Sequence, residues 1–106
     1  MFKSAKDAMA ARAAQSYIND LISRYGVVRE LRLDSERKSI SVSCELVGET
    51  SPIAIEISTY ELRQRDGKTY FSVVACRSSR PWLENVLNDH VRGREFPVPP
   101  WAAMAL

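Results

Sequence analysis

Residues 53–77 read IAIEISTYELRQRDGKTYFSVVACR, and this segment decides the fold. Asp66-Gly67 near its middle is a strong signal for a two-residue β-hairpin turn, which requires a positive φ at both positions. The residues on either side are rich in Ile, Val, Tyr, Phe and Thr, which favour strands. The segment therefore predicts two antiparallel strands joined by a tight turn at Asp66-Gly67.

This turn also predicts the register of the hairpin. The opposed pairs are expected to be Leu62–Phe71, Tyr60–Val73 and Ile57–Cys76. Directly opposed side chains share one face of a sheet. Because Ile57 and Tyr60 are three residues apart, either a bulge between them restores the alternation or the hairpin carries apolar groups on both faces. We expect both faces to be partly covered.

Toward the N-terminus, a helix is predicted over residues 4–25, with Ser4 as N-cap, Asp7 completing a weak capping box and Gly26 as a left-handed C′ residue. Polar positions, including Asn19, lie opposite an apolar stripe at helical spacing. That stripe consists of Ala10, Ala14, Tyr17, Ile18, Leu21, Ile22 and Tyr25.

Two further strands are predicted between this helix and the hairpin. Residues 27–33 place Val27, Leu31 and Leu33 on one face, with Arg29 interrupting the strand. Residues 39–47 alternate apolar and polar side chains, which is typical of a strand buried on one face only.

After the hairpin, a second helix is predicted with Ser78 or Ser79 as its N-cap, Pro81 in its first turn and Gly93 at its end. The prolines of residues 96–101 predict an extended tail, which ends in an apolar segment. The apolar stripe of this helix consists of Trp82, Leu83, Val86, Leu87, His90 and Val91.

The pattern as a whole predicts one α+β domain spanning residues 1–106: a long N-terminal helix, a four-stranded antiparallel meander, a second helix and an extended apolar C-terminal tail. Residues 1–3 and 94–106 are expected to be flexible or docked on a partner. The net charge of +2 gives little field to steer a polyanion. Without a transmembrane run or a signal segment, we expect a cytoplasmic protein in a reducing compartment.

Residue chemistry predicts neither a catalytic centre nor a metal or cofactor site. His90 is the only histidine, and no Cys/His pair has metal-ligand spacing. Cys44 and Cys76 are expected to be buried free thiols, because a whole strand separates them. No glycine-rich loop leads from a strand into a helix, so the phosphate-binding motifs are absent from the sequence.

Apolar surface is the remaining functional signal, because one layer of helices cannot cover all of it. We expect a non-enzymatic binding or assembly domain whose partner is itself or another protein. One alternative is an apolar ligand, such as a lipid, between helix 4–25 and the sheet; the second is single-stranded nucleic acid. The tail is expected to cover the second face of the hairpin, in the same subunit or a neighbour. The candidate interface residues are Phe2, Met9, Tyr60, Leu62, Phe71, Phe96, Trp101, Met104 and Leu106.

Overall fold

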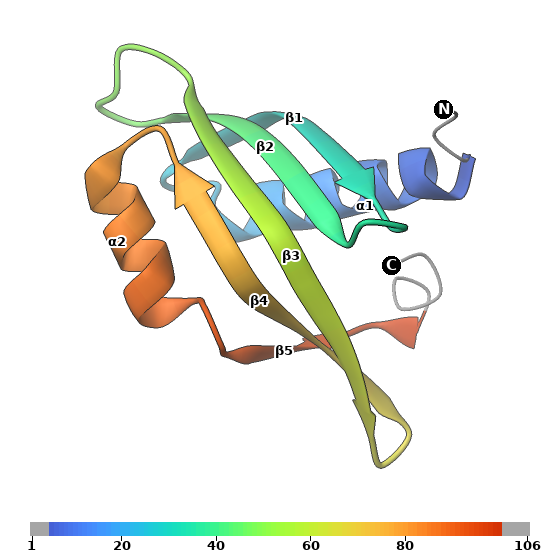
Figure 1. Cartoon of the computed structure of the whole chain (residues 1–106). Helices are drawn as coiled ribbons and strands as arrows, with labels where there is room; N and C mark the ends of the chain where they lie inside the picture. The colour runs from blue at the N-terminus through green and yellow to red at the C-terminus, as the bar shows by residue number, and fades with distance from the viewer. Residues whose placement is uncertain (1–4, 101–106) are drawn as a thin grey trace.

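The computed structural model describes residues 5–100, with side chains from residue 7 onward, as two helices against a twisted five-stranded sheet (Figure 1). All strands are antiparallel, and each pairs with its neighbours in sequence, in the order β1-β2-β3-β4-β5. The α+β class and the meander are therefore confirmed, and the tail adds a fifth strand to the four that the sequence predicted. The elements are α1 (Ala5–Leu21), β1 (Gly26–Asp34), β2 (Ser39–Leu46), β3 (Ile53–Arg65), β4 (Lys68–Ser78), α2 (Pro81–His90) and β5 (Glu95–Val98).

The core lies between α1 and the inner face of the sheet, where apolar residues form rows across the strands. α1 contributes Ala10, which is buried, and Ala14 and Ile18, which pack against the same cluster; Ile22, in the turn after α1, packs there too. Because alanine is small, α1 can approach the sheet closely and cover these rows. The rows are Val28–Cys44–Ile53, Leu31–Val42–Ile55 and Leu33–Ile40–Ile57–Cys76.

A bulge in β1 decides how α1 is rotated. The register shifts between Val28 and Glu30, so Arg29 interrupts the pairing as predicted, and Val28 is buried where Val27 was expected. The Val28 N–H donates to Asn19 Oδ1 at 2.6 Å, and its carbonyl accepts from Gln15 Nε2 at 3.0 Å. The prediction of a solvent-facing Asn19 is therefore wrong, because its amide satisfies the backbone groups of the β1 edge.

Because of this rotation, part of the apolar stripe predicted for α1 does not face the core. Asn19 lies about 200° around the helix from Tyr17, so turning Asn19 onto β1 turns Tyr17 outward. Tyr17, Leu21 and Tyr25 are exposed, and only the alanines and isoleucines of the stripe pack inward. α1 ends at Leu21, four residues before the predicted end.

The β3–β4 hairpin has the predicted turn and register. Asp66 and Gly67 have φ values of 52° and 76°, as the two-residue turn requires. The pairing is irregular on both sides of Thr59, and these two irregularities bring Tyr60 into the same core cluster as Ile57. The bulge alternative therefore holds for Ile57 and Tyr60, which share the inner face, while Val74 leaves an exposed apolar side chain on the other face.

The predicted helix caps are also corrected. Gly26 has no positive φ and begins β1; a Cβ there would lie 2.2 Å from the Glu45 carbonyl oxygen, so the close approach of β2 requires glycine. The N-cap of α2 is Arg80, without a side-chain cap. Ser79 instead accepts a hydrogen bond from Ala54 N–H, and Ser78 Oγ accepts one from Arg80 N–H.

α2 lies beside β4 and packs less deeply than predicted. Leu83 packs against the core, but Trp82 and Val86 are about half exposed and His90 is exposed. α2 ends at His90, before the predicted end at Gly93. Neither helix described in residues 5–100 is long and apolar enough to cross a membrane.

Candidate interaction surfaces

Four of the predicted interface residues come together at the hairpin end of the inner face. Leu62 faces Phe71 across β3 and β4, and Phe71 faces Phe96 across β4 and β5. The rings of Tyr60 and Phe71 stack with their centroids 5.0 Å apart. We call Leu62, Phe71 and Phe96 the hairpin row. Phe2, Trp101, Met104 and Leu106 lie outside the described residues.

β5 reaches the hairpin in a way that the sequence did not predict. The described part of the tail does not lie across a face of the hairpin; Glu95–Val98 pairs along the edge of β4 and lengthens the sheet. Phe96 thereby joins the inner face, where it remains 39% exposed. Backbone hydrogen bonds rather than side-chain burial therefore position this segment.

Tyr60 lies in a closed, partly polar environment next to the hairpin row. It is 1% exposed, and its hydroxyl has no hydrogen-bond partner among the described residues. Desolvation raises the pKa of Tyr60 to about 12, and the charges of Asp7 and Asp34 add to this effect. The phenol is therefore protonated at neutral pH.

Asp7 joins α1 to the sheet; the predicted capping box with Ser4 lies outside the described residues. The Asp7 carboxylate is buried and accepts hydrogen bonds from the Ser35 hydroxyl at 2.6 Å and the Ser35 N–H at 3.2 Å. These bonds join the first turn of α1 to the β1–β2 turn. Asp7 therefore holds the helix against the sheet.

Four exposed apolar side chains lie around the end of α1. Tyr17 and Leu21 are one helical turn apart, and the Val47 N–H donates to the Tyr25 carbonyl at 2.7 Å, which joins the turn after α1 to the end of β2. We call Tyr17, Leu21, Tyr25 and Val47 the α1 patch; they are 55%, 62%, 63% and 79% exposed. Met9 lies two turns before Tyr17 on the same helix and is 72% exposed.

The sequence contained a signal for this patch that its interpretation missed. Tyr17 and Leu21 each come one residue before Ile18 and Ile22, which places them about 100° away around the helix. The two rows therefore cannot both face the core that Ala10, Ala14 and Ile18 contact. The helical periodicity was correct, but the stripe was too wide.

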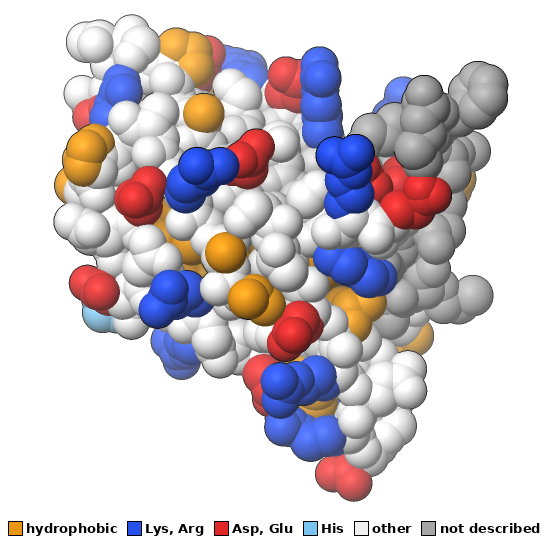
Figure 2. Space-filling view, viewed as in Figure 1, with side chains coloured by type: hydrophobic (Ala, Val, Ile, Leu, Met, Phe, Trp, Pro, Cys, Tyr) orange, Lys and Arg blue, Asp and Glu red, His pale blue; other side chains and the backbone are white. Residues whose placement is uncertain are grey.

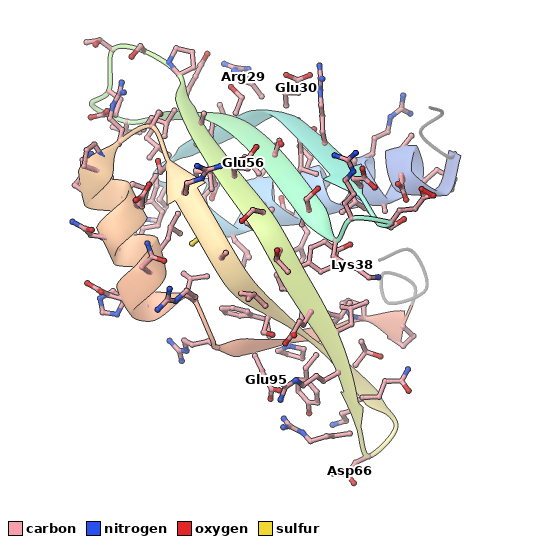
Figure 3. All side chains as sticks on the ribbon, in the orientation of Figure 1. Arg29, Glu30, Lys38, Glu56, Asp66 and Glu95 are labelled. Carbon is pink, nitrogen blue, oxygen red and sulfur yellow. The ribbon has the colours of Figure 1, made fainter. Side chains whose placement is uncertain are left out.

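The outer face of the sheet carries mixed charges among small polar residues. Arg29 pairs with Glu45 at 3.1 Å and Arg77 pairs with Glu56 at 3.2 Å. Figure 2 shows basic and acidic side chains interleaved over this face, and Figure 3 labels Arg29 and Glu56 on it. Such pairs are solvated and leave little net field for a nucleic-acid backbone.

The two cysteines are free and buried, with β3 between their strands as predicted. Burial raises the pKa of both thiols, and for Cys76 the charge of Arg92 partly opposes this increase. Cys76 Sγ lies 3.8 Å from Asn88 Oδ1. Within residues 5–100, no group of three His, Cys, Asp or Glu side chains could hold a metal ion.

Comparison with known proteins adds no assignment: no protein-family model, curated protein or solved structure gives a significant match to this chain.

Proposed function

We propose that this protein is a small non-enzymatic binding and assembly domain that self-associates through the α1 patch. The observation that carries the proposal is the clustering of four large apolar side chains, each more than half exposed, at one end of the molecule. Burying an apolar side chain of this size contributes roughly 1.5–3 kcal/mol. Contiguous exposed patches of this kind mark interfaces in soluble domains.

A second copy of the chain is the partner that we propose. The net charge of +2 produces little repulsion between copies. Arg12 and Asp20 on α1 and Arg24 in the following turn are exposed and supply charges of both signs around the patch. A two-fold interface places the same patch on both subunits, so an apolar patch with mixed charges at its margin is self-compatible.

Strand edges give less support to association by sheet extension. At the β1 edge, Asn19 and Gln15 already bond the backbone of Val28. At the other edge, β5 has only four residues and includes Pro97, which has no N–H to donate. Short edge strands with proline resist pairing. We therefore propose an interface made of side chains.

Native mass spectrometry and analytical ultracentrifugation of Leu21→Lys test the proposal. Leu21 is 62% exposed, so the substitution should leave the fold intact while a lysine at the interface disrupts association. Val74→Lys is the matched control, because Val74 is exposed on the face of the sheet that lies opposite α1. We expect a dimer for the wild type and Val74→Lys, and a folded monomer for Leu21→Lys. A wild-type monomer at high concentration would refute self-association.

The two alternative functions have weaker support. The interface between α1 and the sheet is packed, with Leu33, Cys44 and Ile53 at most 3% exposed, so an apolar ligand has more support at the hairpin row than under α1. Single-stranded nucleic acid is less favoured because arginines of the outer face are paired with carboxylates. Mass spectrometry of the native protein would also reveal a co-purified ligand. A cytoplasmic location stays a prediction, which cell fractionation can test.

A further inference from the structure

An open hollow of about 620 Å³ lies where β5 separates from β4, away from the α1 patch. Glu61, Ser72 and Glu95 form one row across β3, β4 and β5 beside it. Figure 3 labels Glu95 next to the long β3–β4 hairpin, whose tip carries Asp66. Side chains that end in nitrogen lie around Glu95 in this view. The hollow is lined by Glu61, Arg63, Arg65, Ser72, Val73, Val74, Arg92, Gly93 and Glu95.

The three arginines of the hollow differ in their partners. Arg63 pairs with Glu61 at 3.5 Å, and Arg65 pairs with Glu95. Arg92 lies in the connection between α2 and β5 and forms no ion pair with any described residue. The Gly93 N–H donates to the Val73 carbonyl at 2.9 Å, which holds this connection against β4. Arg92 is thus an uncompensated cation whose backbone is fixed.

We propose that this hollow binds the head group of a small organic anion, a carboxylate or a phosphate, with Arg92 as the main ligand. Guanidinium groups bind both head groups through paired N–H donors. Ser72 lines the same hollow and has a hydroxyl that can be a second donor, while the exposed side chain of Val74 offers an apolar surface to the body of the ligand. This site shares no residue with the α1 patch, so it does not depend on the proposed self-association.

The two carboxylates of the hollow restrict what it can bind. Glu61 and Glu95 balance the charges of two arginines, which leaves a net charge of +1 among the lining residues. A single carboxylate or phosphate head group therefore fits better than a polyanion, whose further charges would lie near both glutamates. Two charge-assisted hydrogen bonds predict weak binding, with dissociation constants of about 1 mM.

Amide chemical shifts of the ¹⁵N-labelled full chain test the site, with hexanoate and hexyl phosphate as probes. We expect saturable shifts at Ser72, Val74 and Gly93, and none with hexanol or with sodium chloride at the same ionic strength. Arg92→Gln should weaken binding about tenfold, as expected for the loss of one charge-assisted bond. Arg94→Gln is the matched control, because Arg94 is exposed nearby but does not line the hollow.

Each outcome decides the proposal. Tighter binding of hexanoate assigns a carboxylate ligand, and tighter binding of hexyl phosphate assigns a phosphate ligand. Equal affinities of wild type and Arg92→Gln, or equal shifts from hexanol or sodium chloride, would overturn it. The amide spectrum of the free variant reports its fold in the same experiment.

Discussion

Replacing Tyr60 with Phe removes a buried hydroxyl that has no hydrogen-bond partner among the described residues. Leaving such a group unsatisfied costs roughly 1–3 kcal/mol, whereas the void left by one oxygen atom offsets part of that gain. The ring itself stays in place, stacked on Phe71 at 5.0 Å. At pH 7 we therefore expect Tyr60→Phe to leave the free energy of unfolding unchanged or to raise it by about 1 kcal/mol.

The difference between the two proteins should depend on pH. The pKa of Tyr60 is raised from 10.0 in the unfolded chain to about 12 in the folded protein. Between these values the unfolded chain loses the proton and the folded protein keeps it, so stability falls as pH rises. The full contribution is present below pH 10, and roughly 2 kcal/mol is lost as pH rises toward 12, because one unit of pKa difference corresponds to about 1.36 kcal/mol. Tyr60→Phe lacks this loss.

Urea denaturation, followed by tryptophan fluorescence at several pH values from 7 to 11.5, measures both effects. Tyr25→Phe is the matched control, since Tyr25 is 63% exposed and its hydroxyl is solvated. Its unfolding free energy should stay within about 0.5 kcal/mol of the wild-type value at pH 7. A loss of more than 1 kcal/mol in Tyr60→Phe at pH 7 would refute the reasoning, because the hydroxyl would then have to form a favourable hydrogen bond.

Four further predictions concern the backbone and the thiols. Gly26→Ala should lower the free energy of unfolding by more than about 2 kcal/mol, since a Cβ there would lie 2.2 Å from a backbone oxygen. Gly67→Val should lower it by roughly 1–2 kcal/mol, because valine is strained at the positive φ of this position. An unchanged denaturation midpoint in one of these variants would contradict the prediction for that variant. Asn19→Ala should cost roughly 1–3 kcal/mol, because a backbone N–H of β1 loses its partner at 2.6 Å; a smaller loss would mean that water replaces the amide. Cys44 and Cys76 should titrate as two free thiols after unfolding without reductant, and more slowly in the native protein; an intramolecular disulfide would contradict the strand order.

The sequence by itself determined the features that depend on neighbouring residues. Asp66-Gly67 selects the turn because few other pairs tolerate positive φ twice, and that turn sets the register of β3 against β4. Alternation along residues 39–47 predicted the buried face of β2, because side chains of a strand point to opposite faces in turn. The separation of Cys44 from Cys76 followed from the strand order alone.

Tertiary structure alone decided which surfaces remain exposed. The face of α1 that packs is set by a bulge in β1 whose backbone groups require Asn19, and this rotation exposes Tyr17 and Leu21. Phe96 reaches the inner face through backbone pairing with β4, and Arg92 reaches the hollow because Gly93 is held by Val73. These positions depend on hydrogen bonds between residues distant in sequence, which local periodicity does not encode.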